Sequence, residues 1–172
     1  MFFSRLLAIA LSLLLISCQK PEIPQGNLVK VERAISGQTI EVISTADNIA
    51  LRQQVRLLGI ESPDIKQDPW GKQAQQKLEQ LIKGKQVLLE SDVEEKDRFD
   101  RRLAYLWQDT VLLNEVLVKE GYVLAAARSP NTKYQQRLAD AQEWARLMGR
   151  GLWNSELPLR QTPAEFRQQN QK

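Results

Sequence analysis

Two runs of sequence decide the fold and point to the chemistry: Val-Arg-Leu-Leu-Gly-Ile-Glu-Ser-Pro-Asp at residues 55–64 and Asp-Arg-Phe-Asp-Arg-Arg-Leu-Ala-Tyr at residues 97–105. Each run joins a strand-like apolar segment to arginines and carboxylates. The planar guanidinium of arginine can hold a phosphate through two hydrogen bonds, so Arg56 and Arg101 are candidates for a phosphate clamp. Carboxylates beside such a clamp can hold a hard divalent cation and orient a water molecule. The sequence therefore favours chemistry on a phosphodiester.

Together with Ser-Gly-Gln-Thr at residues 36–39, these runs resemble the signature of the staphylococcal-nuclease-like, or thermonuclease, domain. That signature reads roughly D-G-D-T, then R-L-x-x-[IV]-D-T-P-E, then D-x-Y-G-R-x-L-A-Y. Leu-Asn-Glu at residues 113–115, Ser-Pro-Asn-Thr at 129–132 and Gly-Leu-Trp at 151–153 also resemble the family. Several dispersed motifs in the right order are more specific than any one alone, and they extend the resemblance over residues 28–156.

The resemblance implies a calcium-dependent nuclease that hydrolyses single-stranded or flexible DNA or RNA with low base specificity. It assigns the scissile phosphate and the attacking water to three catalytic residues, namely Arg56, Arg101 and Asp64. It assigns the calcium ion to the side chains of two residues and the carbonyl of a third, namely Gln38, Glu61 and Ser62.

Three of these positions depart from the family pattern. Gln38 replaces an aspartate and brings no negative charge, so we expect a lower affinity for calcium. Glu61 keeps the charge of the aspartate it replaces but is longer. Asp64 replaces a glutamate and is shorter by one carbon–carbon bond of about 1.5 Å. These departures keep a second hypothesis open, in which a non-catalytic barrel binds an oligonucleotide, a saccharide or an envelope partner, and a third, a purely structural envelope protein.

Substrate contacts outside the clamp also differ from the family pattern. Phe99 stands in place of a tyrosine, and Ala-Ala-Ala-Arg at residues 125–128 stands where the founding enzymes carry base-stacking tyrosines. Asp100 replaces a glycine; aspartate tolerates a left-handed backbone better than most residues, and its charge could compete with phosphate for Arg101. The remaining candidates for nucleic-acid contact are Arg98, Phe99 and Arg128.

Composition narrows the choice of mechanism and of partner. The 172 residues contain 24 Lys and Arg against 21 Asp and Glu, a net charge of +3, so a nucleic-acid site must be local rather than spread over the surface. The chain has no histidine, which excludes histidine bases, Ser-His triads and histidine metal sites. Carboxylate and metal chemistry remains, and we expect a monomer.

The N-terminal segment indicates export and anchoring. A basic start and a short apolar core at residues 1–17 are typical of a signal peptide, and Leu-Ile-Ser-Cys at residues 15–18 resembles the bacterial lipobox. Cys18 is the one cysteine of the chain, and lipidation would explain it; the alternative is an ordinary signal peptide with an incidental cysteine. We therefore predict a membrane anchor at Cys18, a tether over residues 18–27, and a location in the cell envelope outside the cytoplasm.

The pattern of apolar residues predicts an α+β protein. The segments rich in β-branched residues predict five strands, at residues 28–35, 39–43, 50–60, 86–90 and 103–107. Helical spacing predicts three helices, at residues 68–83, 111–120 and 133–148. Such an order matches the family's five-stranded OB-fold barrel packed with three helices, as one domain over residues 28–156. The tail at residues 157–172 is polar and rich in glutamine, so we expect it to be largely disordered.

Overall fold

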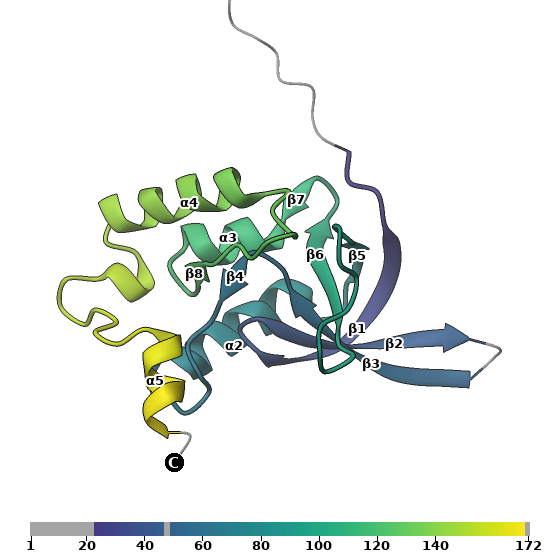
Figure 1. Ribbon diagram of the computed structural model, residues 1–172, viewed down its shortest axis with the longest axis horizontal. Helices are drawn as coiled ribbons and strands as arrows, with labels where there is room; N and C mark the ends of the chain where they lie inside the picture. Colours follow the sequence, from purple (N-terminus) through teal and green to yellow (C-terminus); the bar gives the residue numbers. More distant parts are fainter. Residues whose placement is uncertain (1–22, 47–48, 171–172) are drawn as a thin grey trace, which may run out of the picture.

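A closed β-barrel forms the centre of the computed structural model, which describes residues 23–46 and 49–170 (Figure 1). The main sheet has the order β3-β2-β1-β5-β6-β7, and pairing of β3 with β6 closes five of its strands into a barrel. The strands are β1 (Asn27–Ser36), β2 (Thr39–Ala46), β3 (Ile49–Leu57), β4 (Ile60–Glu61), β5 (Gln86–Glu90), β6 (Arg102–Gln108), β7 (Val111–Leu112) and β8 (Leu124–Ala125). The helices are α2 (Trp70–Ile82), α3 (Leu113–Lys119), α4 (Gln135–Leu147), the short 3-10 helix η2 (Gly151–Trp153) and α5 (Pro163–Asn170). The predicted OB-fold barrel is confirmed.

Parallel pairing of β3 with β6 brings the two decisive runs together. Arg56 lies opposite Leu103 in this ladder, and the N–H of Leu58 donates to the carbonyl of Ala104 at 2.9 Å. The other barrel pairings are antiparallel. Residues nearly fifty positions apart in the chain are therefore neighbours, and the arginines of both runs come to one end of the barrel.

The β1–β2 hairpin carries Gln38 at its tip, as predicted. A Cβ atom at Gly37 would overlap the side chains of Ala74 and Ser62, so glycine is the residue that lets this turn approach α2 and the loop after β4. The turn is thereby held against the segment that carries the other predicted metal ligands.

The third predicted strand, over residues 50–60, is wrong at its end. Strand β3 stops at Leu57, and Gly59 takes a left-handed conformation with φ of 71°. A residue at that φ cannot continue an extended strand, so the chain turns and resumes as β4, which pairs with β8. The turn redirects Ile60 and Glu61 away from the barrel ladder.

Apolar side chains fill the barrel and its contacts with the helices. Helix α2 buries Ala74, Leu78 and Ile82, which recur at helical spacing, and Gly84 follows it with φ of 71°. Burying one such large side chain stabilises the fold by roughly 1.5–3 kcal/mol. The barrel contributes buried side chains from each of its five strands, including Val31, Ile40, Val42, Val55, Leu57, Val87, Leu89, Leu103 and Leu106. Helices α3 and α4 pack against each other beside β6 (Figure 1).

The C-terminal tail is ordered where disorder was predicted. Residues 163–170 form α5, whose first turn is capped by reciprocal hydrogen bonds between Thr162 and Glu165. The tail is also attached to the domain, because the N–H of Leu159 donates to Leu152 at 2.8 Å. The Ser/Thr-x-x-Glu spacing of this capping box is a sequence signal for the start of a helix. The prediction of disorder followed the polar composition of the tail instead of this signal.

The predicted signal peptide at residues 1–17 and the predicted lipidation site Cys18 lie outside the described residues. Of the predicted tether, residues 23–26 have no regular secondary structure, and β1 begins at Asn27. Within residues 23–46 and 49–170, no helix is both long enough and apolar enough to cross a membrane.

Candidate active site

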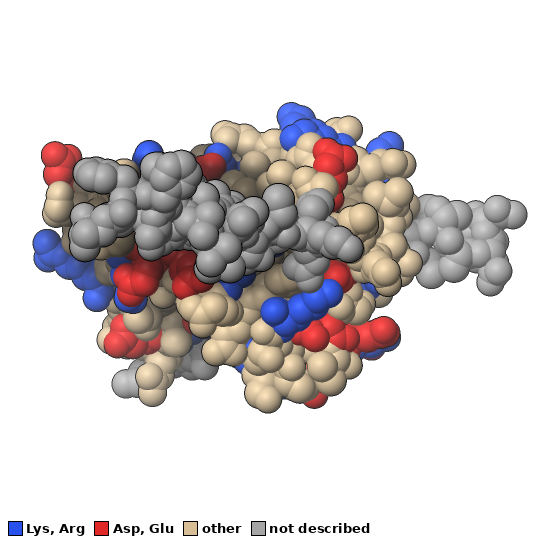
Figure 2. All heavy atoms as spheres, turned by 90° about the horizontal axis from the view of Figure 1, so that it is seen from above, with Lys and Arg blue, Asp and Glu red and all other residues tan. Residues whose placement is uncertain are grey.

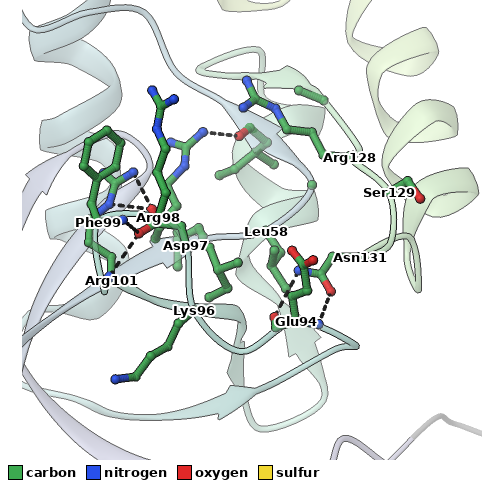
Figure 3. Close-up of a pocket in the computed structure, with 16 residues that line it drawn as sticks. Leu58, Glu94, Lys96, Asp97, Arg98, Phe99, Arg101, Arg128, Ser129 and Asn131 are labelled. Carbon is green, nitrogen blue, oxygen red and sulfur yellow. Dashed lines mark hydrogen bonds and ion pairs between the residues drawn. The ribbon is translucent and has the colours of Figure 1, made fainter.

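A cavity of about 750 Å³ opens where the end of β3 meets the β5–β6 loop and the segment after β8. Figure 3 shows Arg98, Phe99 and Arg101 on one side of it and Arg128 on the other. Four arginines, which we call the arginine cluster, line this cavity: Arg56, Arg98, Arg101 and Arg128. Both members of the predicted clamp, and all three predicted nucleic-acid contacts, therefore share one pocket.

Arg56 is the buried member of the cluster. Its Nη2 donates to the carbonyl of Ile60 at 3.2 Å, whereas Nη1 is buried and has no hydrogen-bond partner among the described residues. Burial and, to a smaller extent, the positive charges of Arg101 and Arg128 together lower the pKa of Arg56 to about 10. At neutral pH the group is still charged. A buried cation with an unused donor is costly, so the site is suited to an anion that would accept from Nη1.

Arg101 is fixed in place by Asp97. Oδ2 of Asp97 accepts from Nε of Arg101 at 2.8 Å, and Oδ1 accepts from the backbone N–H of Arg101 at 3.0 Å. Burial raises the pKa of Asp97, but the hydrogen bonds from Arg101 and from the backbone N–H of Phe99 lower it more, and the net shift is downward. Asp97 therefore remains ionised and orients the guanidinium at the edge of the cavity. Sequence reasoning gave this aspartate no role, although it opens the second run.

Asp100 adopts the left-handed conformation that its glycine-like position suggested, with φ of 61°. Its carboxylate accepts from Nζ of Lys96 at 2.6 Å, at an exposed position. Arg101 forms its ion pair with Asp97. The expectation that Asp100 competes with phosphate for Arg101 is therefore wrong, because Asp100 pairs with Lys96 instead.

Phe99 offers a flat apolar surface at the mouth of the cavity. Its side chain is 64% exposed, and the guanidinium carbons of Arg98 and Arg101 lie 4.7 and 5.5 Å from the ring centroid. An exposed ring next to cationic groups can stack against a nucleobase whose phosphate the arginines hold. Arg128 contributes a solvent-exposed positive charge opposite, since its side chain is 75% exposed.

Two of the predicted metal ligands, Gln38 and Ser62, are hydrogen-bonded to each other, and Ser62 follows the third, Glu61, in the chain. The Oε1 atom of Gln38 accepts from the backbone N–H of Ser62 at 2.7 Å, which joins the hairpin tip to the residue after Glu61. Oε1 of Glu61 accepts from Nη2 of Arg167 and lies 3.9 Å from Nη2 of Arg128. Among residues 23–46 and 49–170, no group of three or more acidic or thiol side chains gathers as a ready metal site. Glu61 is the one carboxylate among the three predicted metal ligands, and it is paired with the guanidinium of Arg167.

Asp64 does not line the cavity. Its Oδ1 accepts from the backbone N–H of Lys66 at 2.9 Å, so the carboxylate stabilises the local backbone turn that follows it. The backbone of Asp64 packs closely against Gly71, where a Cβ atom would overlap it. The structure therefore brings together Arg56, Arg101 and Glu61 and leaves Asp64 outside the group.

Four arginines are concentrated in this pocket. On the described part of the face in Figure 2, basic and acidic side chains are interspersed, and neither sign forms a broad field. Because the net charge of the chain is only +3, an anionic ligand would be attracted by the arginine cluster rather than by a broad positive field.

Comparison with known proteins agrees with this geometry. Residues 54–155, which contain both decisive runs, match the family described as staphylococcal nuclease homologue. This chain belongs to the staphylococcal nuclease family. It is 36% identical over 131 residues to a thermonuclease of Staphylococcus hyicus, covering 73% of this chain and 75% of that protein. It is 32% identical over 134 residues to a thermonuclease of Staphylococcus intermedius, covering 75% and 77%. Endonuclease YncB of Bacillus subtilis is 34% identical over 123 residues, which cover 67% of this chain and 56% of YncB.

Two residues of the site, Gln38 and Arg167, lie outside the part that matches the staphylococcal nuclease family. Arg167 belongs to α5, beyond residue 155, yet its guanidinium contacts Glu61, which lies 106 positions earlier in the chain. Its charge also acts on Arg56. Periodicity and local motifs gave no signal for this contact, because a single arginine in a polar tail has no pattern that names its partner.

Proposed function

We propose that this protein is a nuclease that hydrolyses phosphodiester bonds in single-stranded or flexible DNA or RNA. The observation that carries this proposal is Arg56, whose buried Nη1 has no hydrogen-bond partner among the described residues and which lines a cavity together with three further arginines. A phosphate in this cavity would supply the missing acceptor and neutralise the mutual repulsion of the cluster. Membership in the staphylococcal nuclease family and the thermonuclease relatives support the same substrate class.

In the proposed reaction, a water oxygen attacks phosphorus as the bond to the leaving oxygen breaks. Arg56 and Arg101 bind the phosphate and stabilise the negative charge that develops on its oxygens. Asp64 is the residue that we propose accepts the proton of the water. Its carboxylate must first leave the N–H of Lys66, so we expect this step to be slow in the conformation described here.

Calcium is the proposed cofactor, and its fit depends on the oxygen atoms that the predicted ligands can offer. The carboxylate of Glu61 already holds a cation, the guanidinium of Arg167, and the side-chain oxygen of Gln38 lies against Ser62. Oxygen donors of this kind suit calcium, which would add positive charge next to the bound phosphate. We propose Glu61, Gln38 and the carbonyl of Ser62 as its ligands. With one carboxylate in the set, we expect weak binding.

We also propose that the nuclease is exported, lipidated at Cys18 and held as a monomer in the bacterial cell envelope. The support is the basic start, apolar core and lipobox-like end of residues 1–18. Labelling cells with a radioactive fatty acid tests the anchor: the wild-type protein should become labelled, and a Cys18→Ser variant should not.

A second candidate function is a binding module that kept the barrel and lost catalysis. The observation that favours it is Asp64, whose carboxylate is turned to the backbone of Lys66 and does not line the cavity. A binding module would hold single-stranded nucleic acid through the arginine cluster without cleaving it.

Incubation of the purified protein with single-stranded DNA and RNA, with millimolar calcium or with chelator, separates the two functions. We expect calcium-dependent cleavage that is lost in Arg56→Ala and Arg101→Ala. Arg52→Ala is the control for Arg56→Ala, because both residues lie on β3. Arg102→Ala is the control for Arg101→Ala, because Arg102 is the next residue and begins β6. Binding without cleavage would favour the module, and full activity in either clamp variant would refute the assignment of the clamp.

A further inference from the structure

The carboxylate of Glu61 is shared between the pocket and the C-terminal tail. Its side chain is 13% exposed, and its Oε1 atom accepts from Nη2 of Arg167 with Nη2 of Arg128 at 3.9 Å. The Arg167 side chain is itself only 32% exposed. A partly buried ion pair of this kind neutralises the charge of Glu61 before any other cation arrives.

The position of Arg167 is set by more than this ion pair. The side-chain amide of Gln67 donates to the carbonyl of Gln161 at 2.7 Å, and Pro163 at the start of α5 is buried. In Figure 1, α5 lies beside the loop that leaves β4, which carries Glu61 at its end. The tail is thus held at Gln161 and Pro163, at the start of α5, and α5 presents its one arginine to Glu61.

We propose that Arg167 is the resident counter-cation of Glu61, and that a divalent cation binds this carboxylate only in competition with α5. This inference rests on the calcium site of the proposed function and assigns its regulation to the tail. Two cationic groups on one carboxylate repel each other, and Arg128 adds a third positive charge nearby. Binding of the metal therefore favours release of Arg167, and a docked α5 raises the metal concentration that the nuclease requires.

The size of the effect follows from the population of the docked tail. An apparent dissociation constant equals the intrinsic one divided by the fraction of molecules in which the site is free. If α5 holds Glu61 in about nine molecules of ten, removal of the ion pair should tighten calcium binding about tenfold. The same competition requires that calcium loosen α5 in the wild-type protein.

Calorimetric titration of calcium chloride into the full-length protein, without nucleic acid, tests this proposal. The variants are Arg167→Gln, which keeps a helix-forming side chain, and the control Arg160→Gln, which removes an exposed charge from the same tail. We expect calcium to bind about tenfold more tightly to Arg167→Gln than to the wild type, and Arg160→Gln to match the wild type. Glu61→Gln in the Arg167→Gln background should abolish the gain. Hydrogen exchange of the amides in residues 163–170 should accelerate when calcium is added to the wild type.

Calcium affinity that is unchanged or weaker in Arg167→Gln would overturn the proposal, as would the absence of calcium binding in both proteins. None of these readouts needs turnover. If calcium binds more tightly to Arg167→Gln but the protein cleaves no nucleic acid, the proposed nuclease function is refuted and the competition between calcium and Arg167 is supported. If the protein is an active nuclease but its calcium affinity does not depend on Arg167, the competition alone is refuted.

Discussion

Asp97 holds Arg101 at two points, with Oδ1 on its backbone N–H at 3.0 Å and Oδ2 on its Nε at 2.8 Å. The aspartate thereby fixes both the loop and the direction of the guanidinium. We expect Asp97→Asn to lower kcat by about tenfold to a hundredfold, because misplacing a catalytic group by about 1 Å has that effect. Steady-state kinetics on single-stranded DNA would measure the change. Asp100→Asn is the control, since Asp100 pairs with Lys96 at the surface; equal losses in both variants would contradict a specific role of Asp97.

The same carboxylate gives a pH dependence with a defined sign. The pKa of Asp97 is lowered in the folded protein, so its stabilising contribution is complete above the unfolded value of about 3.9 and is lost as the pH falls through the folded value. The difference in thermal midpoint between the wild type and Asp97→Asn should therefore be constant from pH 7 to pH 5 and shrink below pH 4. A difference that does not change in acid would show that Asp97 is not ionised in its contact with Arg101.

Much of this site could be predicted from local sequence, because a short motif fixes both the residues and the strand that carries them. Arg56 and Arg101 were found in this way, and the β3–β6 pairing brings them to one cavity. Arg167 could not be found, since its contact with Glu61 depends on how a distant helix docks. The break at Gly59 was missed for a related reason: the apolar residues on both sides continue the strand pattern, and the φ of the glycine is decided by tertiary contacts.

One tertiary contact at this turn is made by Asn114, which is fully buried between the turn after β3 and strand β6. Its Nδ2 donates to the carbonyl of Leu58 at 2.8 Å, and its Oδ1 accepts from the N–H of Leu106 at 2.9 Å. We expect Asn114→Ala to lower the free energy of unfolding by about 2–4 kcal/mol, because two buried backbone groups lose their partners. Urea denaturation would measure it. Asn154→Ala, which removes an exposed cap, should change it by less than about 1 kcal/mol, and equal losses would contradict the bridging role.

Glu90 is a buried carboxylate surrounded by donors. It accepts from Nε1 of Trp107 at 2.8 Å, from the hydroxyl of Tyr134 at 2.9 Å and from Nζ of Lys133 at 2.6 Å. Removing the acid takes one hydrogen-bond partner from each of Trp107, Tyr134 and Lys133, so we expect Glu90→Ala to cost about 3–5 kcal/mol of unfolding free energy. Unfolding followed by tryptophan fluorescence would measure this cost. Glu95→Ala, in the exposed loop, is the control, and a Glu90→Ala protein as stable as this control would contradict the role of the network.

The position of Asp64 leads to a gain-of-function prediction. Asp64 is held in its turn by the N–H of Lys66, a local contact that suits the short aspartate side chain. Glutamate would lose that contact and reach farther by about 1.5 Å, toward the phosphate that Arg56 and Arg101 would hold. We expect Asp64→Glu to raise kcat by about tenfold to a hundredfold with little change in KM, since a repositioned catalytic group acts on the chemical step. Single-turnover cleavage of single-stranded DNA would measure the rate, with Asp68→Glu as the control at an exposed neighbouring acid. If Asp64→Glu leaves the rate unchanged and Asp64→Ala does too, the proton acceptor is another group, and the role proposed for Asp64 is wrong.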